Sequence, residues 1–333
     1  MNGQDILLAV SGLRLSFRTP RGTVQAVSDA SFQVRRGEVT GIVGESGSGK
    51  SVTSLSVIGL LMGTTGRITE GEIILDGEDI TKYNEKQRRK LRGSKISMIF
   101  QEPMTSLNPV MRIGRQIREK ILQHEKISKK EADAEVIKLL QMTGLPRVER
   151  IVNEFPFQLS GGQRQRVMIA LALACKPEIL IADEPTTALD VTIQAQILTL
   201  MDQLKKETGT SILFITHDFG VVAEVCDDVV VMYCGRIVEK GTVNDIFQKT
   251  AHPYTEGLLN SIPKIGVRAE ELDVIPGNVP NPKYMPNGCK FSDRCKYCFA
   301  KCLEEEPGFA DLGNGHFSRC WRSFPDFKEQ EAE

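Results

Sequence analysis

The segment GESGSGKS at residues 44–51 is the clearest indication of the fold, because it follows the apolar run VTGIV and leads into the helix-length segment SVTSLSVIGLL. Strand, glycine-rich loop and helix in this order are typical of a loop that binds phosphate. Glycines let backbone N–H groups converge on phosphate oxygens, and the helix N-terminus adds partial positive charge. We therefore expect a bound nucleotide, with Lys50 reaching the β- and γ-phosphates and Ser51 binding magnesium. The expected contacts are Gly44, Ser46, Gly47, Gly49, Lys50 and Ser51.

An acidic pair follows a second apolar run. Residues 179–182 read ILIA and are followed by Asp183 and Glu184. The carboxyl end of a strand is where an α/β sheet binds its ligand. We expect Asp183 to hold magnesium through water and Glu184 to polarise the water that attacks the γ-phosphate. Taken alone, the pair would also suit a helix cap before Pro185.

A third motif, LSGGQ at residues 159–163, opens the helical stretch RQRVMIALALA. Its serine and glycines form a second helix start suited to an anion. A single bound nucleotide would not contact two anion-binding helix N-termini of the same chain in any obvious way. We infer that this segment, with Ser160, Gly161, Gly162 and Gln163, serves a nucleotide held by another copy.

Strand-length apolar runs alternate with helical patterns over the first 250 residues, which predicts an α/β fold with a parallel sheet. The predicted buried strands are residues 39–43, 96–100, 179–182 and 211–216. Residues 229–241, VVVMYCGRIVEKG, predict a hairpin around Cys234 and Gly235. Between the second and third strands we expect a helical subdomain, at about residues 104–160. One predicted helix has an apolar stripe of Ile113, Ile117 and Ile121, and a second has a stripe of Val136, Leu139 and Leu140. The second helix would begin at a capping box formed by Ser128 and Glu131 and end at Gly144.

Composition narrows the class of protein. Of 333 residues, 41% are hydrophobic and 26% charged, and the net charge is −1, as in a globular protein. This balance argues against binding to nucleic acid through phosphate neutralisation, and we expect the basic run at residues 82–92 to be a solvated helix face. The apolar stretch at residues 167–175 is too short to cross a bilayer. The first 17 residues do not read as a secretory signal, so we expect a cytoplasmic protein that reaches a membrane only through partners.

The three motifs in this order resemble the ATP-binding subunit of an ABC transporter. The resemblance implies a P-loop ATPase (ABC ATPase) core with bound ATP and Mg²⁺. It places Gln101, in FQEP, at the magnesium and the transmembrane partner, and His217, in ITHD, at the γ-phosphate. Residues 188–190, ALD, match the loop that faces the second subunit, and Phe17 is similar to the aromatic residue that stacks on adenine. Without the motifs, His217 would be interpreted as a histidine with satisfied hydrogen bonds at the end of a strand. Phe17 would be interpreted as an ordinary core residue.

The same resemblance implies a mechanism and partners. ATP on Lys50, Ser51 and Asp183 of one subunit is covered by Ser160 and Gly162 of a second ABC ATPase subunit, identical or paralogous. Lys50, Glu184 and His217 are the expected catalytic residues. Two transmembrane permease subunits hold the protein at the cytoplasmic face of the cell membrane, and an extracytoplasmic peptide-binding protein acts indirectly.

The C-terminal part resembles the extension of oligopeptide and dipeptide importers, through AHPYTEGLLNSIP, PGNVPNP and GCKFSDRC. We expect an ABC ATPase domain at residues 1–255 and a small cysteine-rich domain at 256–333, in which prolines favour irregular chain. The implied function is ATP hydrolysis that powers peptide import. Nickel import is the alternative within the family, and a non-transport ATPase acting on nucleic acid is the alternative outside it. The latter usually carries two cores or a long coiled coil, whereas this chain has one core.

Five cysteines lie in the last 45 residues. In a reducing compartment such a cluster predicts a metal site before disulfides. A tetrahedral site or an iron–sulfur cluster needs four ligands, so one thiol is spare. In relatives, the thiols resembling Cys289, Cys295, Cys302 and Cys320 can carry a [4Fe–4S] cluster. Cys298 departs from that pattern and is an alternative ligand. Its spacing to Cys295 would also suit Zn²⁺, with His316 as a ligand. Thiols without any bound metal are the remaining alternative.

Overall fold

The computed structural model describes residues 5–20, 22–61, 64–102, 106–187, 189–262 and 274–327. Its internal contacts divide the chain into two compact units. The first consists of Met1–Leu7, Val34–Val39 and Asp76–Ile215, and the second of Leu8–Gln33, Thr40–Leu75 and Thr216–Glu333. The second unit thus combines N-terminal strands with the C-terminal part. The sequence-based boundary at residue 255 stays a prediction.

The first unit is built on three parallel strands. Strand β7 lies between β6 and β8, with Ile96 opposite Ile179 and Asp183 opposite Ile215. All three strands are buried, which is why they read as continuous apolar runs. The predicted strand at 96–100 ends one residue early, at Ile99, and the next residue, Phe100, is 37% exposed. The elements are β5 (Glu78–Asp79), α2 (Glu85–Leu91), β6 (Ile96–Ile99), α4 (Ile113–His124), α5 (Lys129–Met142), α6 (Val148–Ile151), η2 (Pro156–Gln158), α7 (Gly161–Leu173), β7 (Ile179–Asp183), α8 (Val191–Thr208) and β8 (Ser211–Thr216).

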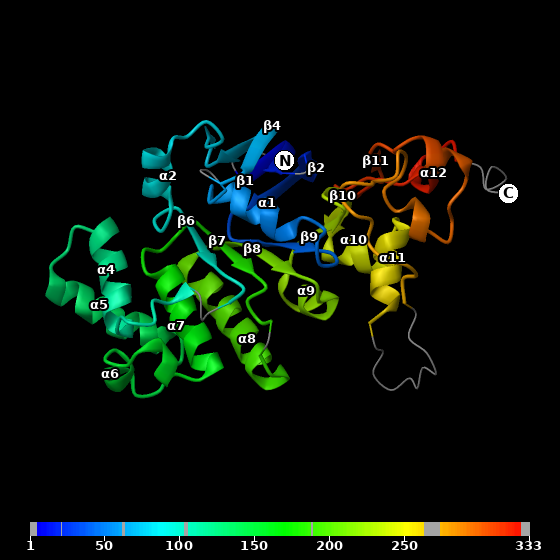
Figure 1. Cartoon of the computed structure of the whole chain (residues 1–333). Coiled ribbons are helices and arrows are strands. Elements are labelled where there is room, and N and C mark those ends of the chain that lie inside the picture. The colour runs from blue at the N-terminus through cyan, green and yellow to red at the C-terminus, as the bar shows by residue number, and fades with distance from the viewer. Residues whose placement is uncertain are drawn as a thin grey trace. The chain divides into compact units, whose positions relative to one another are not determined.

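The predicted helical subdomain is present in this unit. Helices α4 and α5 lie side by side near α7, and both predicted apolar stripes are buried in one cluster (Figure 1). Ser128 and Glu131 form the expected capping box, and Gly144 follows α5 with a φ of +67°. The basic run forms α2, but it is not wholly a solvated face. Arg88 is 2% exposed, because its guanidinium donates to the carbonyls of Tyr83 and Thr81.

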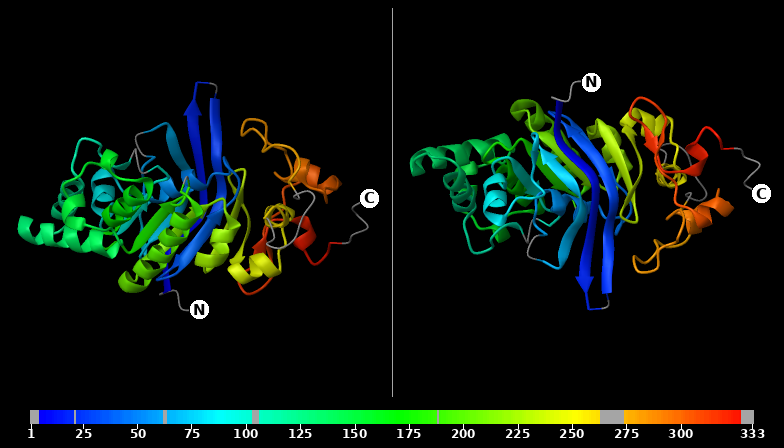
Figure 2. Two further views of the ribbon diagram at one scale, coloured as in Figure 1. Left: turned by 90° about the horizontal axis from the view of Figure 1, so that it is seen from below. Right: turned by 90° about the horizontal axis from the view of Figure 1, so that it is seen from above.

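The second unit contains β3 (Val39–Val43) beside β9 (Asp228–Tyr233) in parallel pairing, and β9 forms a hairpin with β10 (Arg236–Thr242). Cys234 and Gly235 both have positive φ, as the predicted two-residue turn requires. Antiparallel pairing of β1 (Ile6–Thr19) with β4 (Gly66–Leu75) was not expected from sequence. Figure 2 shows β1 and its neighbour β2 (Gly22–Arg35) as long strands. The other elements are α1 (Lys50–Val57), α9 (Phe219–Val225), α10 (Val243–Gln248), α11 (Pro253–Asn260), η3 (Ser292–Arg294), α12 (Ala300–Glu304), β11 (Ala310–Asp311), β12 (Phe317–Ser318) and η4 (Trp321–Ser323).

The C-terminal part is fixed to this unit by strands and by a core. Strand β12 pairs antiparallel with β10, with Ser318 opposite Glu239. Phe291 packs against Tyr233 and Tyr254 in a core that also contains Val43. In the described segments of the chain, no helix combines the length and apolar composition needed to cross a bilayer.

Candidate nucleotide site and thiol pocket

The phosphate-binding loop, residues 44–51, connects the end of β3 to the start of α1. Two of its glycines are required by geometry. Gly44 has a φ of +148°, and a Cβ there would lie 2.1 Å from the Met232 carbonyl oxygen. Gly49 has a φ of +101°, and a Cβ there would lie 3.0 Å from the Ala26 carbonyl oxygen. A side chain at either position would therefore displace backbone.

Lys50 folds over this loop. Its ammonium donates to the carbonyl oxygens of Gly44 (2.7 Å) and Glu45 (3.0 Å), and the residue is 5% exposed. Ser51, partly buried, follows it in the first turn of α1, whereas Ser46 and Gly47 are exposed. A buried cation and a helix start thus lie on a loop with exposed backbone. This arrangement suits a polyphosphate.

Two further predicted residues belong to the same unit. Phe17 lies opposite Gly66 in the β1–β4 pair, and its ring is 2.9 Å from where a Gly66 Cβ would be. The ring is therefore seated over a glycine and is only partly buried. His217 follows the last residue of β8 and is exposed.

The acidic pair belongs to the first unit, at the carboxyl end of β7. Asp183 is 6% exposed. Glu184 has a φ of +46°, an uncommon conformation for this residue. Its Oε2 accepts hydrogen bonds from Gln101 Nε2 (3.0 Å) and Thr187 Oγ1 (2.9 Å). The structure thus brings Gln101 and Glu184 together, although 83 positions separate them in the sequence.

The segment at residues 159–163 begins helix α7, as expected. Ser160 is its N-cap: Ser160 Oγ accepts from the Gln163 N–H (3.3 Å), and Gln163 Oε1 accepts from the Ser160 N–H (3.0 Å). Ser160 and Gly161 are exposed, and Gly162 is partly buried, with space for a Cβ limited by Ile193. Asp190 caps α8 through the N–H of Ile193. Ala188 lies outside the described residues.

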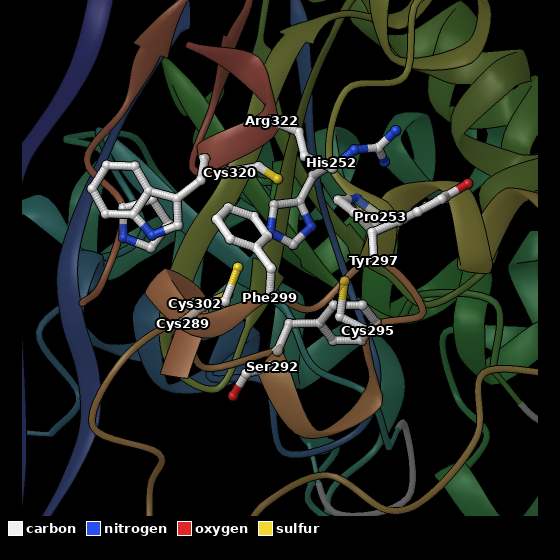
Figure 3. A pocket seen from close by; sticks show the side chains of 13 residues that line it. His252, Pro253, Cys289, Ser292, Cys295, Tyr297, Phe299, Cys302, Cys320 and Arg322 are labelled. Atoms are coloured by element: carbon white, nitrogen blue, oxygen red, sulfur yellow. The ribbon is translucent and has the colours of Figure 1, made fainter. Parts of the chain in front are cut away.

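Four tail thiols line one pocket, which we call the thiol pocket: Cys289, Cys295, Cys302 and Cys320. The ring of His252 also lies on its wall, and Figure 3 shows these side chains. Burial raises the pKa of Cys289 to about 12, and those of Cys295 and Cys320 to about 11. Cys298 does not line the pocket, so the lining thiols are the four implied by resemblance.

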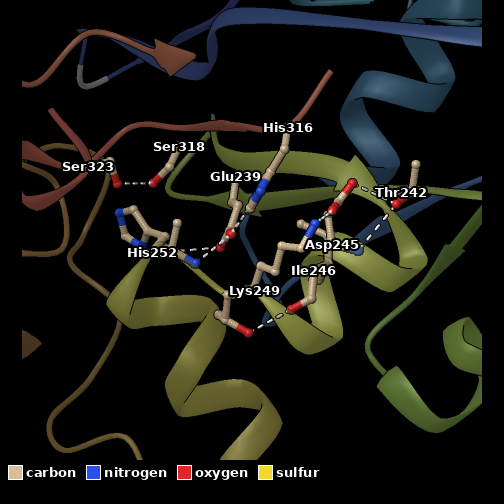
Figure 4. A network of polar contacts seen from close by, with 11 residues as sticks. Glu239, Thr242, Asp245, Ile246, Lys249, His252, His316, Ser318 and Ser323 are labelled. Atoms are coloured by element: carbon tan, nitrogen blue, oxygen red, sulfur yellow. Dashed lines mark hydrogen bonds and ion pairs between the residues drawn. The ribbon is translucent and has the colours of Figure 1, made fainter. Parts of the chain in front are cut away.

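The described side chains do not form a site for a single metal ion. Among them, no three His, Cys, Asp or Glu residues lie close enough together to hold one metal ion. His316, the alternative zinc ligand, is engaged elsewhere (Figure 4). Its Nε2 lies 2.9 Å from Oε1 of Glu239, a fully buried carboxylate that also accepts the N–H groups of Ala251 and His252. The suggestion of a His316 ligand was therefore wrong.

Sequence reasoning missed a contact of the phosphate-binding loop. Glu45 forms a two-bond ion pair with Arg294, and its N–H donates to Tyr254 Oη (2.8 Å). No motif signals this contact, because 249 positions separate Glu45 from Arg294.

Comparison with known proteins gives consistent results along the chain. Residues 27–187 match the ABC transporter family model, and residues 238–302 match the model of the oligopeptide/dipeptide transporter C-terminal region. The oligopeptide transport ATP-binding protein AppD of Bacillus subtilis (strain 168) is 50% identical over 327 residues, covering 98% of both chains. OppD of Salmonella typhimurium (strain LT2) is 48% identical over 318 residues, covering 96% of this chain and 94% of that protein.

Solved structures agree with the fold. A dimeric structure of the ATP-binding cassette MJ0796, in a post-hydrolysis state bound to ADP and Pi, is 29% identical with a TM-score of 0.64. The match covers 71% of this chain and 99% of that one. The P-loop α/β fold, the motif order and the near full-length relatives lead to one conclusion: this chain belongs to the family of ATP-binding subunits of oligopeptide and dipeptide ABC transporters.

Proposed function

We propose that this protein binds and hydrolyses ATP to power the import of oligopeptides or dipeptides through an ABC transporter. The observation that carries the proposal is the AppD likeness, 50% identity over 98% of both chains, together with a phosphate-binding loop built as described above. Nickel import and action on nucleic acid are less well supported, because the relatives compared above are named for peptides and the net charge is −1.

In this proposal Lys50 and the loop N–H groups bind the β- and γ-phosphates, and Phe17 stacks on adenine. Ser51, Asp183 and Gln101 supply oxygen ligands, which are the kind that Mg²⁺ prefers. Glu184 acts as the general base, and His217 contacts the γ-phosphate. The hydrogen bonds from Gln101 and Thr187 support this role for Glu184, because they fix the carboxylate in one orientation.

Ser160, Gly161, Gly162 and Gln163 complete the site of a second ATPase subunit. Their exposed or half-exposed position at the start of α7 supports this role. Closure of the pair on ATP drives two permease subunits, and an extracytoplasmic peptide-binding protein delivers the cargo. The protein then lies at the cytoplasmic face of the membrane, held by the permeases. We keep residues 1–255 as the ATPase domain and 256–333 as the cysteine-rich extension.

We further propose that the thiol pocket holds a [4Fe–4S] cluster rather than Zn²⁺. Each iron of such a cluster takes one thiolate, so its four thiols surround it instead of meeting at one ion. The four thiols that line the pocket match this number of ligands, and this match supports the proposal. The role of the cluster would be structural, because its four thiolate bonds would hold together an irregular segment.

The function is tested in liposomes that contain the chain, its permeases and its co-purified ATPase partner. Adding a peptide-binding protein loaded with peptide should stimulate ATP turnover, and the Glu184→Gln variant should abolish the stimulation. A rate of ATP turnover that is the same with and without the loaded binding protein would contradict the proposal.

A further inference from the structure

Glu45, the second residue of the phosphate-binding loop, is held from three directions. Its N–H donates to Tyr254 Oη at 2.8 Å, and its carbonyl oxygen accepts from Lys50 Nζ at 3.0 Å. Its carboxylate accepts from both terminal nitrogens of Arg294, at 2.7 and 3.0 Å. Arg294 comes from the C-terminal extension, and Tyr254 comes from the start of helix α11 just before it, so residues far along the chain hold the loop.

Arg294 is itself fixed. It is 7% exposed, its Nε donates to the Pro276 carbonyl oxygen at 2.8 Å, and its guanidinium lies over the Tyr233 ring. Beneath the pair, Tyr233, Tyr254 and Phe291 form a cluster with ring centroids 4.6 to 5.4 Å apart. A planar guanidinium with both terminal nitrogens on one carboxylate sets orientation as well as charge.

The negative charge of the Glu45 carboxylate is unfavourable for binding phosphate at this loop. Glu45 is the one acidic residue within residues 44–51, and a polyphosphate is strongly negative. Without Arg294, an uncompensated carboxylate would lie on the phosphate-binding loop and repel the ligand. With Arg294, the pair is neutral and the loop is preorganised.

We propose that Arg294 is a positioning residue for nucleotide binding, through which the C-terminal extension holds the phosphate-binding loop. This inference rests on the proposed function of that loop. Arg294 also lies between Cys289 and Cys295 in the chain, within a turn whose backbone bonds run from Ser292 N–H to the Cys289 carbonyl and from Cys295 N–H to the Ser292 carbonyl. A segment that carries two pocket thiols therefore also carries the contact to the loop.

The test is the dissociation constant for Mg–ADP, measured by calorimetry on the full-length chain. Because 29% of the Glu45 side chain is exposed, water screens part of its charge, and Arg294→Gln should weaken binding by about tenfold, or about 1.4 kcal/mol. Glu45→Gln added to Arg294→Gln should restore most of that affinity, since it removes the repelling charge. A merely structural role for Arg294 would leave the loss unrescued.

Lys296→Gln is the matched control. It removes a cation from the same segment, where exposed Lys296 pairs with half-buried Glu256, and should leave the dissociation constant unchanged. If Arg294→Gln does not fold, Arg294→Lys replaces it; one ammonium cannot copy a two-bond pair, so binding should weaken about threefold. Unchanged affinity in a folded Arg294 variant, or no rescue by Glu45→Gln, would overturn the inference. Failure of the wild-type chain to bind Mg–ADP would instead refute the proposed function.

Discussion

The replacement of Glu184 by glutamine separates chemistry from nucleotide binding. The carboxylate is fixed by Gln101 and Thr187, and glutamine keeps its shape while losing the ability to take a proton. A positioned general base contributes about 10² to 10⁴ in rate. Because Glu184 is held by two hydrogen bonds, we expect a loss of about 10³, equivalent to about 4 kcal/mol of activation free energy. Affinity for ATP should not fall, since the phosphate-binding loop is intact.

The assay is single-turnover hydrolysis of ATP by the complex purified from membranes, with nucleotide binding measured on the same sample. Thr187→Val is the matched control, because it removes one hydrogen bond from Glu184 but leaves the base. It should slow hydrolysis less than Glu184→Gln does, by about ten- to a hundredfold, the loss expected for one hydrogen bond to a charged group. A Glu184→Gln complex that hydrolyses ATP within threefold of the wild-type rate would refute the assignment of the base.

Three further predictions follow from the two candidate sites and their surroundings. Lys50→Ala should abolish measurable Mg–ATP binding in calorimetry, because it removes the buried ammonium over the loop; retained binding would contradict the assignment. Anaerobically purified protein should contain iron and sulfide that Cys289→Ser removes and Cys298→Ser retains; equal loss in both variants would contradict the four-thiol set. Burial lowers the pKa of His252 to about 4, so the unfolded chain binds a proton between pH 6.5 and 4 that the folded chain does not. Stability should therefore fall by about 3 kcal/mol as the pH drops through that window. His252→Asn, which keeps an acceptor for the Tyr254 N–H, should flatten the fall in melting temperature; an unchanged pH slope would contradict the reasoning.

The sequence predicted correctly those structural features that depend on residues close together in the chain. The strand before the phosphate-binding loop, the capping box at Ser128 and the turn at Cys234 all depend on residues close in sequence. The two apolar stripes of the helical subdomain were predictable because burial of one helix face imposes a period.

Contacts between distant residues left no such signal. The sequences around Gln101 and Glu184 indicated a shared site only through the family resemblance, and nothing near Arg294 in the sequence indicated Glu45. Arg88 looked solvated because its run is basic, yet its guanidinium is satisfied by carbonyl groups and is buried. The carbonyl groups of Tyr83 and Thr81 lie only five and seven positions from Arg88, so these hydrogen bonds are local, but a basic composition does not encode them.

The proposed function depends above all on whether ATP pairs two ATPase subunits through the segment at residues 159–163. The mass of the Glu184→Gln chain with its co-purified ATPase partner is measured in solution, with and without Mg–ATP. We predict that ATP yields a pair holding two nucleotides, and that Ser160→Arg prevents pairing while leaving Lys50-dependent nucleotide binding intact. Single subunits that bind ATP without pairing, or pairing that tolerates Ser160→Arg, would contradict it.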